Sequence, residues 1–197
     1  MSGFTLYAAR HGQTEANAAR RFPGHSATPL TEIGKGHGRT MGQILLCELG
    51  SRPALAFVSS PLPRAMATMR LIREELGLPP DDFTTDARLA DIHHGDWTGF
   101  TWDEVIARDP GTHARHVADR WNVKMTGGEC YADVAARVRS FLDEVRGDMV
   151  TVSHGATTQM LRGLLTGMAP RDIIALEEPQ GVVFRVRDNT ITRLDPA

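Results

Sequence analysis

The stretch FTLYAARHGQTEAN, residues 4–17, decides how this chain folds. Residues 4–9 have the length and the apolar side chains of a buried strand, and residues 14–20 can begin a helix. Arg10 and His11 therefore lie at a strand-to-helix turn, where free backbone N–H groups and the positive end of the helix dipole favour an anion. Gly12 allows the chain to approach that anion closely.

The two residues at this turn carry the chemistry expected of a phosphate site. The guanidinium of Arg10 is a planar fork of donors that matches phosphate oxygens. A neutral imidazole beside it can attack phosphorus, so His11 is a candidate covalent nucleophile. On these residues alone, an arginine and a histidine at the rim of an ordinary α/β sheet are an equally open interpretation.

The same pattern returns near the other end of the chain. Residues 149–153 form an apolar run that ends in His154-Gly155, and residues 156–165 follow with helical spacing. A further buried strand over residues 54–59 leads to Arg64, near the start of a helix that we expect Ser60 to cap and that runs to about Leu76. The carboxyl ends of parallel strands share one edge of a sheet, so these turns together predict an anion site.

The order of elements predicts the fold. Strands alternate with helices, which include helices over 41–49 and 131–145, a short strand within 82–86 and a short helix over 170–176. Residues 181–187 and 190–194 are typical of a closing hairpin that turns at Asp188-Asn189. We therefore expect one α/β domain over residues 1–197, a three-layer α/β/α arrangement with a mainly parallel central sheet and an antiparallel edge.

The charge balance and the apolar runs of the chain limit the kinds of partner that the protein is expected to bind. The 197 residues contain 22 Lys and Arg against 24 Asp and Glu, without a block of either sign, so we expect neither a nucleic-acid nor a membrane partner. No apolar run approaches the ~20 residues of a membrane span, and the first residues lack the form of a secretory signal, which favours a cytoplasmic protein. Cys47 and Cys130 lie far apart and are expected to be reduced. A small molecule is the expected partner, and a homo-oligomer is left open.

The loop that contains Asp91, His93, His94 and Asp96 admits a metal-binding interpretation. No octahedral set of carboxylates and no tetrahedral Cys/His spacing accompanies these four residues, so we expect no metal and no other cofactor.

The composition of residues 100–128 predicts a lid-like excursion from the domain. Trp102 and Trp121 lie here among cations, a mixture that suits a lid over an anionic substrate. A solvated helical excursion anchored by the two tryptophans is an equally good interpretation. Four cations of this segment are candidates to bind a second anionic group of a substrate, and the sequence does not select among them: Arg108, Arg115, Arg120 and Lys124.

A series of short motifs, in order along the chain, resembles the histidine phosphatase superfamily, in the branch with cofactor-dependent phosphoglycerate mutases and enzymes similar to fructose-2,6-bisphosphatase and alpha-ribazole phosphatase. They cover nearly the whole chain. They are RHGQT at 10–14, RFPG and PLTEIG at 21–24 and 29–34, SSPLPRAMAT at 59–68, LADIHHGDWTG at 89–99, GGE at 127–129, and VSHG at 152–155.

The resemblance implies a role for each site residue. His11 accepts the phosphoryl group to form a phosphohistidine, while Arg10, Arg64 and His154 hold its oxygens and Asn17 adds a neutral donor. We expect His154 to donate and to be cationic, and His11 to be unprotonated because adjoining cations favour its neutral form.

The candidate general acid, Asp91, departs from the pattern of the branch. The branch usually has Glu where this chain has Asp91, which is one methylene shorter, so Asp91 is expected to protonate the leaving alcohol only if its loop moves inward. Asp86 and Asp96 are the other candidate acids, and a purely structural Asp91 is the alternative. Pro63 and Cys130 also differ from the branch, and neither is expected to touch the chemistry.

The resemblance implies a metal-independent phosphomonoester hydrolase acting on a small phosphorylated metabolite. Hydrolysis is preferred because the chain is short for a mutase and residues 100–128 offer little to exclude water. Two alternatives are a cofactor-dependent phosphoglycerate mutase and a domain that only binds phosphorylated ligands. The sequence does not identify the phosphomonoester.

Overall fold

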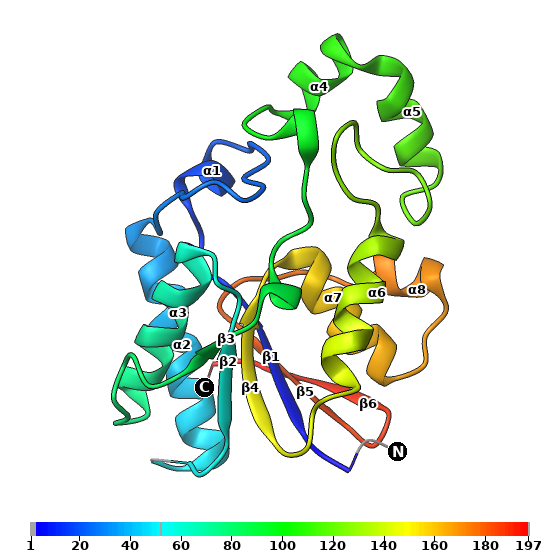
Figure 1. The fold of residues 1–197 in the computed structure, drawn as a ribbon. Coiled ribbons are helices and arrows are strands. Elements are labelled where there is room, and N and C mark those ends of the chain that lie inside the picture. The colour runs from blue at the N-terminus through cyan, green and yellow to red at the C-terminus, as the bar shows by residue number, and fades with distance from the viewer. Residues whose placement is uncertain (1–2, 52, 197) are drawn as a thin grey trace.

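A single mixed sheet organises the structure, a computed structural model that describes residues 3–51 and 53–196. In the described chain the strand order is β3-β2-β4-β1-β5-β6 (Figure 1). The strands are β1 (Leu6–Arg10), β2 (Ala56–Ser59), β3 (Thr84–Thr85), β4 (Met149–Ser153), β5 (Val183–Arg187) and β6 (Thr190–Leu194). The pairs β1–β4, β2–β4 and β2–β3 are parallel, whereas β5 is antiparallel to both neighbours. The mainly parallel sheet with an antiparallel edge is confirmed.

Helices cover both faces of the sheet, as the alternation of elements predicts. Helices α2 (Glu32–Leu49) and α3 (Pro63–Glu75) lie on one face, and α6 (Tyr131–Leu142), α7 (Gly155–Leu165) and α8 (Pro170–Ile174) lie on the other (Figure 1). The remaining helices are α1 (Glu15–Ala18), α4 (Trp102–Arg108) and α5 (Pro110–Ala118), with single 3₁₀ turns over Ala87–Leu89 and Gly95–Trp97. The three-layer α/β/α arrangement is therefore confirmed.

Successive side chains of the central strands point to opposite faces of the sheet and pack into two apolar clusters. Leu6 and Ala8 of β1 pack among residues of α6 and α7, whereas Tyr7 and Ala9 pack among residues of α2 and α3. A strand buried on both faces has no polar side to alternate with, which explains the continuous apolar run at the start of the chain. Both layers thus hold β1 and leave its carboxyl end to carry Arg10 and His11.

Two local expectations are corrected. Helix α3 begins after Leu62, with Pro63 in its first turn, so Ser60 does not cap it. Pro63 is well suited to the first helical position and moves the start of the helix two residues beyond Ser60. Helix α6 ends at Leu142 and so is shorter than expected.

Residues 100–128 lie beyond the carboxyl ends of the strands, at the top of Figure 1. The segment contains α4 and α5, which meet at Asp109. This residue is both the C-cap of α4 and the N-cap of α5. Across residues 3–51 and 53–196, no helix combines the length and apolar character needed to cross a bilayer.

Candidate active site

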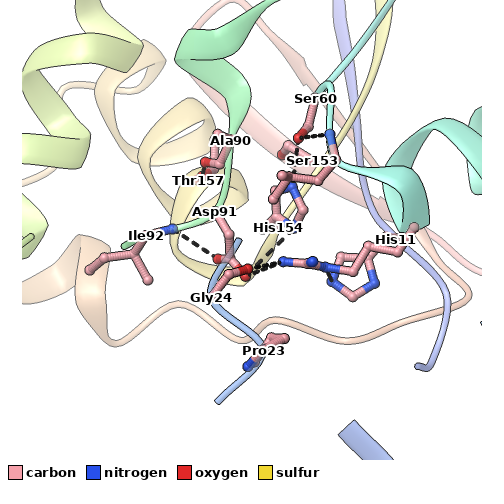
Figure 2. Close-up of polar contacts among 12 residues, drawn as sticks. His11, Pro23, Gly24, Ser60, Ala90, Asp91, Ile92, Ser153, His154 and Thr157 are labelled. Carbon is pink, nitrogen blue, oxygen red and sulfur yellow. Dashed lines mark hydrogen bonds and ion pairs between the residues drawn. The ribbon is translucent and has the colours of Figure 1, made fainter. Parts of the chain in front are cut away.

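The two strand-to-helix turns converge at one edge of the sheet. His11 follows β1 and His154 follows β4, and these strands pair in parallel with Arg10 opposite Ser153. The imidazole centroids are 5.0 Å apart, and the residues are only 1% and 0% exposed. Figure 2 shows His11, His154 and Asp91 lying around one small volume. The structure thus brings together two histidines that lie near opposite ends of the sequence.

Hydrogen bonds fix the tautomer of His11. Its Nδ1 lies 2.7 Å from the carbonyl oxygen of Gly12, which can only accept, so Nδ1 carries the proton. Nε2 is then unprotonated, and the Nε–H of Arg64 donates to it at 3.2 Å. Burial, followed by the charges of Arg64 and Arg10, lowers the pKa of His11 to about 3. The ring is neutral and presents a lone pair on Nε2, as a nucleophile must.

Arg64 lies at the centre of the site. Its Nη2 donates to Asp91 Oδ2 and to the Gly24 carbonyl, both at 2.8 Å, and its Nη1 donates to the Ser26 carbonyl at 3.1 Å. The side chain is completely buried, so these acceptors take the place of water. In the unliganded site a carboxylate therefore binds the cation that the sequence assigns to phosphate.

Asp91 lies in this site as an ionised group. Its Oδ1 accepts from the Ile92 N–H at 2.9 Å, and its Oδ2 accepts from Arg64. Burial by itself raises the pKa of Asp91, but the neighbouring His154, His94 and Arg64 outweigh burial and hold the pKa well below its usual range. Asp91 thus lines the same pocket as His11, and its lowered pKa favours the carboxylate form.

His154 differs from the sequence expectation in charge. Burial holds its pKa well below the usual value, so the unliganded site favours a neutral ring and not the expected cation. Its Nε2 lies 2.8 Å from Ser60 Oγ, a hydroxyl that can donate to it or accept from it. Its Nδ1 lies 3.6 Å from Asp91 Oδ2, and it carries the ring proton when Ser60 donates to Nε2. A neutral His154 can still donate to a bound anion.

Arg10 and Asn17 line the opening of the site, a pocket of about 300 Å³ that also includes His11 and Asp91. Arg10 Nη1 donates to the Glu178 carbonyl at 2.6 Å, and its buried Nε has no partner among the described residues. Asn17 Oδ1 accepts from the Thr14 N–H at 3.1 Å and from Gln180 Nε2 at 3.2 Å. The amide nitrogen of Asn17 is left as the donor for a ligand.

The two other candidate acids lie outside the active-site pocket, and one of the four candidate cations lines it. Asp86 pairs with Arg88 at 2.7 Å, and Asp96 lines a different pocket beneath α4, so neither candidate acid reaches His11. Of the four cations in the lid-like segment, Arg120 alone lines the active-site pocket. Arg108 covers the ring of Phe100, Lys124 pairs with Asp133, and Arg115 donates to Thr112.

No group of three or more His, Cys, Asp and Glu side chains within residues 3–51 and 53–196 is arranged to hold a metal ion.

Sequence reasoning missed three residues that line or support the site. Glu178 and Tyr131 line the pocket, and Ser60 orients His154. The spacing of Tyr131 places it in the apolar stripe of α6, and Glu178 lies in a loop without a motif. The pairing of β5 with β1 brings that loop to the site, and sequence gives no signal for that pairing beyond the hairpin.

Known proteins resemble this chain over almost its full length. Residues 6–188 match the histidine phosphatase superfamily (branch 1). A 2,3-bisphosphoglycerate-dependent phosphoglycerate mutase from Methylobacterium sp. (strain 4-46) is 36% identical over 195 residues, which cover 94% of this chain and 92% of that protein. Phosphoserine phosphatase 1 from Hydrogenobacter thermophilus is 29% identical and covers 92% of this chain and 90% of its own.

A solved structure agrees with both the fold and the family. The mycobacterial glucosyl-3-phosphoglycerate phosphatase in complex with VO₃ superimposes with a TM-score of 0.81 at 30% identity, covering 98% of each chain. Mutases and phosphatases thus both occur among the proteins that this chain resembles.

Proposed function

This chain belongs to branch 1 of the histidine phosphatase superfamily, and on that premise we propose that it hydrolyses a small phosphomonoester through a phosphohistidine at His11. One observation carries the proposal. The Nε2 lone pair of His11 faces a guanidinium, with Arg10 and His154 close by, so a nucleophile and the donors for phosphoryl oxygens share one site. Phosphoryl transfer requires mainly such positioning and charge stabilisation.

Phosphate and Asp91 compete for the same cation, and this competition gives Asp91 its proton. Arg64 binds Asp91 in the unliganded site. A phosphoryl group that takes over the guanidinium removes the cation from Asp91 and brings a like charge beside it, and both changes raise the pKa of Asp91. The carboxyl group that loses Arg64 is then able to hold the proton that the leaving alcohol needs.

The reaction proceeds in two balanced steps. In the first, the bond between His11 Nε2 and phosphorus forms while the ester P–O bond breaks, and the leaving oxygen takes the proton of Asp91. In the second, Asp91 removes a proton from a water molecule that attacks phosphorus, and the N–P bond breaks. Arg10, Arg64 and His154 Nδ1 hold the three equatorial oxygens in both steps.

Mutase activity is the second candidate, because a phosphoglycerate mutase is among the relatives with the higher identity. The two activities differ in whether water or a second alcohol receives the phosphoryl group. The pocket of about 300 Å³ is also lined by Trp102, the first residue of α4, and by Arg120, and a pocket of this size supports access of water. Arg120 at its rim supports a substrate with a second anionic group, since it has no carboxylate partner among the described residues.

The test is a screen of phosphomonoesters, with and without a second anionic group, for release of inorganic phosphate in the presence of a chelator. We expect release from a subset of esters and an acid-labile phosphoenzyme of the intact chain in mass spectrometry. His11→Ala should abolish both signals, whereas His113→Ala, at a ring on α5 outside the pocket, should retain them.

Three outcomes contradict the proposal. Conversion between 2- and 3-phosphoglycerate that depends on the bisphosphate, without phosphate release, indicates a mutase. Binding of phosphate without turnover of any ester indicates a domain that only binds phosphorylated ligands. A phosphoenzyme that persists in His11→Ala places the covalent bond on another residue.

A further inference from the structure

The active site contains a second carboxylate that the proposed mechanism does not use. Asp91 pairs with Arg64, and in the same way Glu178 lies 3.4 Å from Nη1 of Arg10. Each cation that is expected to bind phosphate thus has a carboxylate beside it. Glu178 belongs to the loop between α8 and β5 and lines the same pocket as His11.

The backbone around Glu178 is held in place from α7 and β1. Arg162, buried in α7, donates to the carbonyl of Glu177, and Gln159 donates to the carbonyl of Leu176 at 2.6 Å. Arg10 donates to the carbonyl of Glu178 itself. Three donors fix the loop, so the Glu178 carboxyl group cannot leave the site by movement of the chain.

The carboxyl group lies against the start of α7. Its Oε2 lies where a Cβ on Gly155, the first residue of α7, would stand. It is therefore next to the start of the helix that follows His154 as well as next to Arg10. About a third of the Glu178 side chain is exposed, and no described group donates a hydrogen bond to its carboxyl oxygens. Oε2 faces the guanidinium of Arg10, and Oε1 is left to hold a proton or to face a ligand.

The charge of Glu178 opposes the binding of phosphate. Arg10 and Arg64 are each paired with a carboxylate, Glu178 and Asp91, so these two pairs carry no net charge, and Arg120 also lines the pocket. A phosphate dianion adds two negative charges at short range. An ionised Glu178 would repel the phosphoryl oxygens, and a proton on Glu178 would remove that repulsion.

We propose that Glu178 is a proton-linked phosphate-binding residue, whose carboxyl group takes up a proton when the phosphoryl group arrives and donates it in a hydrogen bond to a phosphoryl oxygen. This role rests on the phosphate site of the proposed function. It makes Glu178 a determinant of affinity for phosphoryl groups, because binding weakens as the proton becomes scarce.

The groups around Glu178 come from several elements. Arg10 follows from β1, Asp91 from the loop after β3, Arg120 from the segment after α5, Tyr131 from α6, and Arg162 from α7. Burial and the charge of Asp91 raise the pKa of Glu178 in the empty site, while Arg10, Arg162 and Arg120 lower it, and burial is the largest of these effects. A phosphate dianion acts in the same direction as burial.

The experiment is calorimetric titration of the wild type and of Glu178→Gln with inorganic phosphate between pH 6 and 9, in buffers of different ionisation enthalpy. His11, His154, Asp91 and phosphate itself also exchange protons, but they do so in both proteins. We expect Glu178→Gln to take up about one proton fewer per phosphate at neutral pH. The Kd of the wild type should then rise about tenfold per pH unit relative to that of the variant.

Glu177→Gln is the matched control, because that neighbouring carboxylate faces Arg193 and not the pocket; it should behave as the wild type does. A second measurement needs no variant: the ¹³C carboxyl resonance of Glu178 should move to the protonated position when phosphate is added.

Equal proton uptake in the wild type and Glu178→Gln, or an unmoved carboxyl resonance, overturns the role of Glu178 while leaving phosphate binding intact. Loss of affinity in Glu178→Gln by the same factor at every pH indicates a structural role and also overturns it. If inorganic phosphate binds neither protein, the proposed function fails together with this inference.

Discussion

Arg64 reaches the nitrogen of His11 and the carboxylate of Asp91 with one guanidinium group. This arrangement keeps the nucleophile neutral and the acid ionised until a ligand intervenes. A guanidinium can exchange a carboxylate for a phosphoryl oxygen at little cost because both oxygens can accept the same Nη2–H donor. The donors of Arg64 are therefore already arranged around an anionic group, the Asp91 carboxylate.

Replacement of Asp91 by asparagine tests its role as the acid. The side-chain amide of Asp91→Asn has no acidic proton to give to an alcohol, so kcat for an alkyl phosphate should fall by about 10²–10³-fold, within the range typical of general acid catalysis. Nitrophenyl phosphate has a leaving group that needs little protonation, so its kcat should fall by less than about tenfold. Steady-state kinetics with the two esters measure this difference.

Asp86→Asn and Asp96→Asn are the controls, since both carboxylates lie outside the active-site pocket. Both variants should retain wild-type turnover of the alkyl ester. If Asp91→Asn slows the two esters equally, Asp91 only positions Arg64, and the structural interpretation of this residue holds.

Single residues at strand ends were predictable from sequence. Arg10, His11 and His154 directly follow apolar runs, and the geometry of a parallel sheet requires those ends to meet. Glu178 was not predictable, because its place depends on the pairing of β5 with β1 and on hydrogen bonds from α7. The sequence predicts a cationic His154, whereas burial, which the sequence does not show to be complete, lowers the pKa of His154 and favours the neutral ring.

At the scale of elements, the start of α2 is packed directly against the turn that carries His11. A Cβ on Gly34 would overlap the carbonyl oxygen of Gln13, and a Cβ on Gly12 would overlap the carbonyl oxygen of Gly34. Thr31 caps α2, and its backbone N–H donates to the Gln13 carbonyl at 3.0 Å. The helix thus fixes the nucleophile turn by backbone contact.

Gly34→Ala should therefore destabilise the protein, whereas Gly36→Ala on the same helix should not. The added methyl at 34 meets backbone that cannot yield, and overpacking of this kind costs about 3 kcal/mol. Position 36 is exposed with open space around it, so alanine should stabilise the helix by about 0.5–1 kcal/mol. Urea unfolding of both variants measures the difference, and equal stabilities would show that α2 and the turn are not in close contact.

The boundary between α4 and α5 shows how precisely the sequence locates the end of one helix and the start of the next. Proline and glycine stand at positions 110 and 111, a pair that breaks a helix, and the structure starts α5 with Pro110 itself. Proline is favoured in the first helical turn, and the Asp109 side chain caps the new helix by accepting from the Thr112 N–H at 3.2 Å. The residues that stop α4 are thus also the residues that start α5.

On the scale of the whole molecule, the active site is part of the buried interior. His11 and His154 are buried where β1 and β4 end, so their protonation is coupled to folding. A histidine has a pKa near 6.5 in the unfolded chain, whereas that of His11 is about 3 in the folded protein. The unfolded chain therefore binds more protons in this range, and stability is present above pH 6.5 and is lost as the pH falls toward 3.

The free energy of unfolding should consequently fall between pH 7 and pH 4, with about 3 kcal/mol of the fall due to His11 alone. Asp91 contributes little in this window, because its pKa is lowered from a value near 3.9 and its stabilisation is lost only at lower pH. Urea unfolding at several pH values measures the slope. His11→Gln should flatten it by that amount, and His113→Gln on α5 should leave it unchanged. If the slopes of His11→Gln and the wild type coincide, His11 is not held neutral by the fold, and the nucleophile would need deprotonation before each turnover.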